Sequence, residues 1–545
     1  MKKFLITLTV LFLTGSAFAY DLPEVIGVLK PHPPDSLYFG DMFLNIGDQN
    51  NDGCDELLAN HNTFNSPVQG QMPYLNQVKL FYGAERMDDE PDLIFETDSM
   101  FKSLGSSIVY AGNLMPDREP FIVMGSMESH YGGDIEPDAA ILFFEAGQEL
   151  DNEPDIVMRK PDSIAIEMGL LQWNTRPTDV NGDGYHDLIA FETVQQRIEG
   201  NIVCPIIYFG GDDFDTIPDW RFHNRYNGVF QYSTGYDVNN DGYDDFLTRE
   251  GFEQIQYNGS HYGYSLFLGG DPMDTIAAFE IGEYSYESAR LKKRFCLLPD
   301  VNGDGFDDWV IHFFVDPTRD GYYLFYGSEE PDSEPDLILE GNHGLLNYDG
   351  CVCGGDFNND GYGDIVTALW GGYRSRGEMH IHFGSRLMES EAQIHIDGGA
   401  DYNREFRKLG EFLGAVGDYN GDGVDDFVTR VCGEEGFLVI FAGNKEWIVH
   451  VDEDTSPSDY SLSLDIYPNP FNEDVKLKYY ITNRTPTELK VYDISGRCVF
   501  SKTESYDRVG EHICNLDGSN LTAGIYIVRF KSGKNLISRK MVYLP

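Results

Sequence analysis

The sequence predicts an all-β protein, with a seven-bladed β-propeller followed by a small immunoglobulin-like β-sandwich. Three observations lead to this prediction. Short runs of β-branched and aromatic residues alternate with Gly, Pro, Asn and Asp, and no long segment keeps the 3.6-residue period of a helix. An acidic motif returns along the first 450 residues, about 60 residues apart. Near Val451 the composition changes, and Lys and Arg become frequent in a second strand-rich segment.

Composition limits the possible functions. The chain has 545 residues, with 91 Asp and Glu against 39 Lys and Arg, and a formal net charge of −52. Hydrophobic residues make up 41% and aromatic residues 14%, which is too apolar for a disordered acidic protein. Because a chain with this much negative charge repels polyanions, we expect no nucleic-acid partner and no binding to anionic membranes.

The first residues have the pattern of a secretory signal. Lys2 and Lys3 precede an apolar run from Phe4 to Leu13, and Ala17-Phe18-Ala19 is a small-x-small cleavage site. We therefore expect a signal peptide over residues 1–19 and a secreted or outer-surface protein; the alternative is an uncleaved anchor. The apolar run is too short to span a bilayer, and no later segment is long enough, so no transmembrane segment is expected.

The repeated motif reads Asp-x-Asn-x-Asp-Gly-x-x-acid. Its six copies begin at Asp48, Asp179, Asp237, Asp300, Asp356 and Asp418. The first interval is about twice the others, which places a degenerate copy near Asn113, where Asp117 and an apolar run from Phe121 to Met124 keep the frame. The segment from residue 20 to residue 450 therefore contains seven repeats, six of which are acidic.

Each repeat also carries regularly spaced strand signals. A short aromatic strand ending at or near Gly follows each loop, as in Leu80-Phe81-Tyr82-Gly83, and an acidic turn then leads into a further strand, as in Glu90-Pro91-Asp92-Leu93. Four short strands per repeat, repeated seven times, are typical of a β-propeller with one blade per repeat.

The spacing within the motif suits a metal ion. Side-chain oxygens at positions 1, 3 and 5 converge when the chain curls, Gly at position 6 permits positive φ, and an acid at position 9 closes the shell. The position-9 acids are Glu56, Asp187, Asp245, Asp308, Asp364 and Asp426. An all-oxygen set favours Ca²⁺. Position 12 lacks the Glu of a helix–loop–helix calcium site, and the flanking segments, such as Leu188-Ile189-Ala190, are strand-like, so we expect a β-hairpin loop. The alternative of simple polar turns does not explain six copies with one spacing.

These repeats resemble FG-GAP (VCBS-like) repeats, which form the blades of integrin α-subunit propellers and occur in many bacterial surface proteins. A Phe39-Gly40 pair precedes the first loop, and Leu104-Gly105 takes its place in the second repeat. The resemblance implies up to six Ca²⁺ ions, one per acidic loop, and none in the second blade. The ligands that it implies are Asp48, Asn50, Asp52, Glu56, Asp179, Asn181, Asp183, Asp187, Asp237, Asn239, Asp241, Asp245, Asp300, Asn302, Asp304, Asp308, Asp356, Asn358, Asp360, Asp364, Asp418, Asn420, Asp422 and Asp426.

The C-terminal segment has a resemblance of its own. After a polar linker at residues 451–462, residues 463–545 contain four motifs in order: Tyr467-Pro468-Asn469-Pro470-Phe471-Asn472, Val491-Tyr492-Asp493-Ile494-Ser495-Gly496-Arg497, Leu521-Thr522-Ala523-Gly524-Ile525-Tyr526 and Arg539-Lys540-Met541-Val542. They are similar to the type A sorting domain of the type IX secretion system (Por secretion tail). The resemblance implies the secretion machinery as a partner and export across an outer membrane. An ordinary immunoglobulin-like packing module is the alternative.

No catalytic motif stands out, so the sequence predicts no enzyme and no catalytic residues. His380 and His382 share one face of an expected strand and could bind metal, although one side of a sheet explains them too. Trp173, Trp220, Trp309 and Trp370 could stack on sugars, but core packing is expected. The favoured function is a calcium-binding surface propeller that binds an extracellular protein or glycan. The alternatives are a calcium-dependent polysaccharide lyase and a structural surface component.

Two smaller features complete the sequence. The chain has eight Cys, too few for a disulfide framework; Cys351 and Cys353 are expected on one face of a strand, and Cys498 and Cys514 could pair across strands. The insertion from Asn60 to Asn76 is a candidate contact loop.

Overall fold

A computed structural model gives the fold of residues 22–447 and 463–544. The described ranges leave out residues 32–37, 63–75, 86, 97–103, 127–139, 160–164, 168–175, 197–199, 222–230, 253–259, 274–275, 286–294, 315–319, 340–348, 371–376, 398–408, 432–435, 468, 470, 472–473, 482–486, 494–496, 505–509, 519–520, 523 and 533–534. The expected signal peptide, the linker, Trp173 and most of the 60–76 insertion lie outside the described residues. The chain divides into two compact units at Ile448 and Val449.

The described residues of the first unit form seven antiparallel four-stranded sheets. Six of these sheets are built from strands that follow one another along the chain. They are β2 (Tyr38–Asn45), β3 (Leu57–Asn62), β4 (Asn76–Phe81), β5 (Leu93–Glu96); β6 (Leu104–Gly112), β7 (Phe121–Ser126), β8 (Ala140–Glu145), β9 (Ile156–Arg159); β10 (Ala165–Glu167), β11 (Leu188–Gln196), β12 (Gly200–Tyr208), β13 (Trp220–Arg221); β14 (Gln231–Tyr236), β15 (Asp245–Phe252), β16 (Ser260–Phe267), β17 (Phe279–Ser285); β18 (Phe295–Leu298), β19 (Asp308–Phe314), β20 (Asp320–Phe325), β21 (Leu337–Leu339); β22 (Asp349–Gly355), β23 (Asp364–Trp370), β24 (Glu378–His382) and β25 (Ile394–Asp397).

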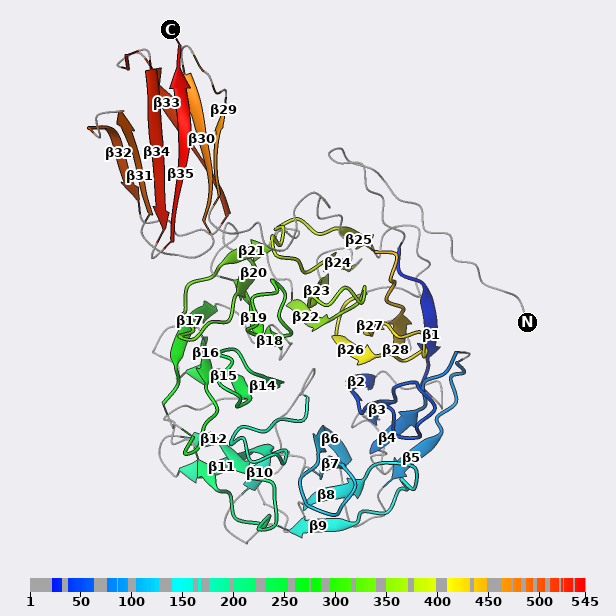
Figure 1. The fold of residues 1–545 in the computed structure, drawn as a ribbon. Coiled ribbons are helices and arrows are strands. Elements are labelled where there is room, and N and C mark those ends of the chain that lie inside the picture. The colour runs from blue at the N-terminus through cyan, green and yellow to red at the C-terminus, as the bar shows by residue number, and fades with distance from the viewer. Residues whose placement is uncertain are drawn as a thin grey trace. The chain divides into compact units, whose positions relative to one another are not determined.

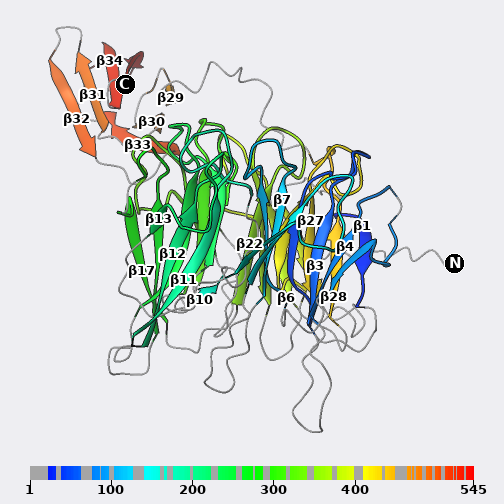
Figure 2. The same ribbon diagram turned by 90° about the horizontal axis from the view of Figure 1, so that it is seen from below.

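The seventh sheet joins the two ends of the repeat region. Its order is β1-β28-β27-β26, so that β1 (Val25–Leu29) is the outer neighbour of β28 (Phe437–Phe441), followed by β27 (Asp426–Val431) and β26 (Leu413–Gly417). The sheets succeed one another around a ring, with β2, β6, β10, β14, β18, β22 and β26 near the centre (Figure 1) and the strands running through the thickness of the ring (Figure 2). This arrangement is a β-propeller-like fold, and the shared sheet holds the ring closed without a covalent link.

The core of the ring lies between adjacent sheets. One cluster joins Leu44 and Leu58 of the first sheet to Ile122 and Leu142 of the second, all at most 4% exposed. Each fully buried side chain of this size contributes about 1.5–3 kcal/mol relative to exposure. Strands buried on both faces explain why many runs are continuously apolar, as in β18, whose four residues are all buried.

The described residues of the second unit form two antiparallel sheets around one hydrophobic core. The sheets are β29-β30-β33 and β32-β31-β34-β35, and Leu477, Val491 and Val528 are among the buried residues that they share. The strand bounds are β29 (Ser463–Tyr467), β30 (Asp474–Ile481), β31 (Thr487–Asp493), β32 (Cys498–Glu504), β33 (Gly510–Asp517), β34 (Gly524–Ser532) and β35 (Asn535–Tyr543). No helix in the described parts of the chain is long and apolar enough to span a membrane. The all-β prediction is confirmed.

Candidate metal centres in the acidic loops

Each acidic loop connects the innermost strand of a sheet to the strand beside it and curls around its own position-1 carboxylate. In all six loops the backbone N–H of position 5 donates to one oxygen of the position-1 Asp, and the N–H of position 6 donates to the other. In the second acidic loop these bonds run from Asp183 and Gly184 to Asp179 at 3.2 and 2.9 Å. One sequence spacing thus gives one hydrogen-bond pattern six times.

Gly at position 6 is required by the backbone conformation. In the six loops this residue has φ between +82° and +93°, a range that L side chains rarely adopt. In five of the loops a Cβ atom there would meet no other atom within 4 Å, so space is not the constraint. Position 4 also has positive φ in every acidic loop, which explains why only Gly and Asn occur there.

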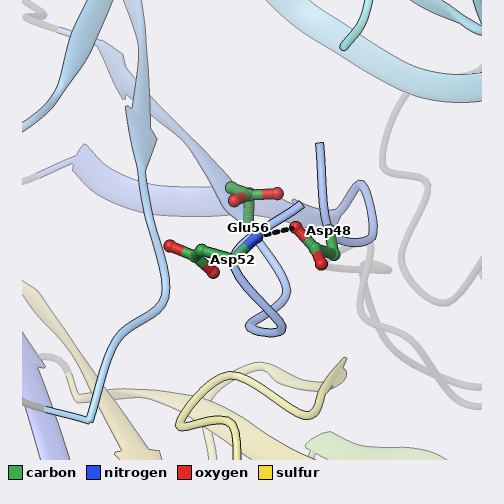
Figure 3. A group of neighbouring side chains, drawn as sticks. All are labelled: Asp48, Asp52 and Glu56. Carbon is green, nitrogen blue, oxygen red and sulfur yellow. Dashed lines mark hydrogen bonds between the residues drawn. The ribbon is translucent and has the colours of Figure 1, made fainter. Parts of the chain in front are cut away.

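The first loop brings three carboxylates together. Asp48, Asp52 and Glu56 each offer an oxygen, and these atoms lie within 4.8 Å of one another (Figure 3). Two oxygens on one Ca²⁺ ion lie at most about 5 Å apart, because each bond is about 2.3–2.6 Å long. Glu56 is fully buried, and its Oε1 has no hydrogen-bond partner among the described residues. The donor set and this orphaned oxygen fit a bound calcium ion.

In the other five loops the position-9 residue is Asp, which serves two backbone groups. Asp245 accepts the N–H of Val238 with Oδ2 and that of Gly269 with Oδ1, both at 2.8 Å. Asp187, Asp308, Asp364 and Asp426 accept equivalent pairs of bonds. The carboxylate therefore ties the loop to the end of the third strand, a role that the sequence interpretation of position 9 as a ligand did not include.

These position-9 acids lie in a strongly negative, buried environment. Burial raises the pKa of Glu56, Asp245 and Asp426 to about 8 and that of Asp187 to about 7. The position-1 and position-5 carboxylates raise these pKa values further, whereas the backbone hydrogen bonds lower them. The same causes raise the pKa of Asp308 and Asp364 well above the usual range. A divalent cation between these acids would oppose the repulsion and favour their ionised forms.

The residue at position 8 links each loop to the loop before it, and the sequence analysis missed this link. Asp244 accepts the backbone N–H of Asp179 at 2.8 Å, and its own N–H donates to the carbonyl of Asp179 at 3.0 Å. Asp307 and Asp425 accept the N–H groups of Asp237 and Asp356 in the same way. An acid at position 8 in four of the six loops was the available signal.

The degenerate loop of the second repeat keeps this link but lacks the ligands. Asn113 donates its N–H to His186 Nδ1 at 2.9 Å, so that a histidine replaces the position-8 carboxylate. Met115 stands at position 3, and Phe121, a fully buried core residue, stands at position 9. This loop therefore preserves the frame of the repeat without its donor set.

Several other residues singled out from the sequence have core positions. Trp220 and Trp309 are buried between sheets, as expected, and the side chain of Trp370 is not described. Cys351 and Cys353 are both fully buried. Cys498 on β32 and Cys514 on β33 belong to different sheets and are free thiols, so they do not pair.

The C-terminal motifs hold the last strand in place. Asn469 accepts the N–H of Val542 and donates its amide to the carbonyl of Lys540, each at 2.8 Å. Tyr526 donates its hydroxyl to the carbonyl of Thr522 at 2.7 Å. The family described as "Secretion system C-terminal sorting domain" matches residues 465–543. Residues 465–543 are a secretion system sorting domain. This sorting domain confirms the resemblance and indicates export to the cell surface or beyond.

Comparison with curated proteins gives a relative for the repeat region. Integrin alpha-5 of Xenopus laevis is 25% identical over 256 residues, which are 40% of this chain and 23% of integrin alpha-5. The chain thus matches about a quarter of that relative's length, and the match supports the FG-GAP resemblance.

Two solved structures from Porphyromonas gingivalis are similar to this chain at low identity. PorZ, described as an essential bacterial surface component of the type IX secretion system, has 11% identity and a TM-score of 0.34, covering 92% of this chain and 60% of PorZ. Dimeric latent PorU has 11% identity and a TM-score of 0.14, covering 76% of this chain and 36% of PorU.

Proposed function

We propose that this chain is a calcium-stabilised, non-catalytic binding protein of the cell surface, exported by the type IX secretion system through its C-terminal domain. Its repeat region is a seven-bladed β-propeller, in which each four-stranded sheet is one blade, and its sorting domain is an immunoglobulin-like sandwich. The ligand of the propeller is an extracellular protein or glycan.

The observation that carries the calcium assignment is the buried, unpartnered Oε1 of Glu56 beside Asp48 and Asp52. An unsatisfied buried oxygen costs about 1–3 kcal/mol, more when charged, and a hard cation removes that cost. The five Asp-containing loops repeat the same backbone pattern, so we extend the assignment to all six. We assign no ion to the second repeat, where Met115 and Phe121 replace donors.

The assignment of a binding role rests on export and on the propeller. A sorted surface protein with integrin-like repeats is suited to contact molecules outside the cell, and rigid sheets position the connecting loops for that contact. The large negative charge is then partly a calcium ligand set and partly a solvated surface.

The test of this role combines binding and turnover. The purified full-length chain is kept in about 1 mM calcium, the upper end of the Kd range of extracellular calcium-binding modules. It is applied to a glycan array and to a panel of extracellular-matrix proteins. Separately, it is incubated with a panel of polysaccharides. Saturable binding that EDTA abolishes supports the proposal. Release of unsaturated or shortened sugar products contradicts the non-catalytic role, and binding to nothing on either panel favours a structural component.

A further inference from the structure

Two isoleucines replace glutamate at a repeated, exposed position of the ring. In the six sheets built from consecutive strands, a residue of the loop between the third and fourth strands donates its backbone N–H to a carbonyl of the third strand, as Asp219 does to Ile207 at 2.9 Å. The residue two positions before this donor is exposed in all six loops. These residues are Glu90, Glu153, Ile217, Ile276, Glu334 and Glu391. Four sheets thus present a carboxylate here, whereas the neighbouring sheets β10-β11-β12-β13 and β14-β15-β16-β17 present isoleucine.

The two isoleucine side chains are the most exposed large hydrophobic side chains among the described residues. Ile217 is 65% exposed and Ile276 is 73% exposed. One exposed apolar side chain is ordinary on a protein surface. Two of them at equivalent positions of adjacent sheets, in a chain of net charge −52, indicate a surface that is covered by another molecule.

The loops that carry the isoleucines border the same acidic loop. Gly210, at the start of the first loop, donates its N–H to Oδ1 of Asp187 at 2.9 Å. Gly270, at the start of the second, donates its N–H to the carbonyl of Val180 at 2.8 Å. Asp187 and Val180 both belong to the acidic loop that begins at Asp179. The two isoleucine loops are therefore parts of one region of the surface.

Both loops are anchored next to their isoleucines. The N–H of Ile217 donates to Oδ1 of Asp215 at 2.5 Å. Trp220, three residues after Ile217, and Ala277, next to Ile276, pack in the same hydrophobic cluster. A surface held in this way loses little conformational freedom when a partner binds.

The charge around the isoleucines is negative. The described residues of the two loops, which are 209–219, 268–273 and 276–278, include no Lys or Arg. They include five exposed aspartates, which are Asp212, Asp213, Asp215, Asp219 and Asp271. A complementary partner therefore combines apolar side chains, which cover the isoleucines, with Lys or Arg side chains, which meet the carboxylates.

We propose that residues 209–219, 268–273 and 276–278 form a docking surface for a basic protein segment with apolar side chains, in which Ile217 and Ile276 are the apolar contacts. This inference rests on the proposed function of binding an extracellular partner. It places that partner on two sheets of the ring and narrows its chemistry from a protein or glycan to a basic protein.

The test measures the binding of two fluorescent peptides to the full-length chain in saturating calcium. The peptides have the same length and charge, and one alternates Lys with Leu whereas the other alternates Lys with Ser. The test variant combines Ile217→Glu with Ile276→Glu, which restores the residue of the other four sheets. The matched control is Ile338→Glu, which changes a 43% exposed isoleucine of β21 on another sheet. Melting curves confirm that each variant is folded.

We expect wild type and Ile338→Glu to bind the Lys–Leu peptide more than about tenfold more tightly than the Lys–Ser peptide, because two isoleucines become buried. The double variant should lose this preference, although its two added charges attract both peptides. Equal binding of the two peptides to wild type, or a double variant that keeps the preference, would overturn the proposal. The peptides are not members of the panel that tests the proposed function. Saturable, EDTA-sensitive binding to that panel without any peptide preference would therefore overturn this surface and leave the proposed function standing.

Discussion

Asp244 holds Asp179 from the neighbouring sheet by two hydrogen bonds, one to the backbone N–H at 2.8 Å and one from its own N–H to the carbonyl at 3.0 Å. Because Asp179 is position 1 of one acidic loop and Asp244 is position 8 of the next, the candidate metal sites are joined in series around the ring. The equivalent backbone hydrogen bond also joins the first acidic loop to the last, since Asp55 donates its N–H to the carbonyl of Asp418.

This link predicts different effects for two substitutions at Asp244. Asp244→Ala leaves the N–H of Asp179 without its acceptor and should lower the free energy of unfolding by about 1–3 kcal/mol. Asp244→Asn keeps an acceptor oxygen and should lose less than half as much. Urea unfolding of both variants in saturating calcium measures the difference, and equal losses would show that the hydrogen bond to Asp179 is not what matters.

Arg430 links the last sheet to the first, which predicts a large effect from its removal. On β27, its Nη1 bonds Glu411 at 2.7 Å, its Nη2 lies 2.9 Å from Asp41, and its Nε donates to a carbonyl of β2 at 2.8 Å. Arg430→Met removes the cation that Asp41 and Glu411 share at the junction of the last and first sheets and should cost about 3–5 kcal/mol. The control is Arg118→Met, which breaks a more exposed pair with Glu145 and should cost less than about 1 kcal/mol. Similar losses in the two variants would contradict this assignment.

The buried Lys79 predicts a pH dependence on the alkaline side. It is 1% exposed and its Nζ lies 5.9 Å from the centre of the Phe39 ring. Burial, partly opposed by Glu90 and Glu96, lowers the pKa of Lys79 to about 8 in the folded state. Between that value and about 10.4, the unfolded chain binds the extra proton, so this residue makes the free energy of unfolding rise with pH, by at most about 1.4 kcal/mol per unit.

Lys79→Met should remove this contribution. We expect wild type to gain stability relative to the variant between pH 7.5 and 9.5, measured by urea unfolding in the same calcium buffer. A stability difference between the two proteins that stays constant over this range would mean that Lys79 keeps its proton in the folded state.

Much of this structure could be predicted from the sequence because its signals are local and repeated. The position-6 glycines, the strand runs and the frame of the degenerate loop at Asn113 all follow from spacing within about ten residues. Two kinds of hydrogen bond could not be predicted: the one that Asp245 accepts from Gly269 and the one that Asp244 accepts from Asp179. Both depend on partners on other strands or other sheets.

The central claim, that the acidic loops bind calcium, is tested most directly by counting the ions. Equilibrium dialysis of the full-length chain against calcium, followed by elemental analysis, should give six calcium ions per chain. Asp183→Ala should give one fewer, and Asp117→Ala in the degenerate loop should give the same number as wild type. Each site should add about 2.7 kcal/mol of stability at a hundredfold excess over its Kd, so EDTA should also lower the melting temperature. A chain that binds no calcium and melts identically in EDTA would contradict the claim.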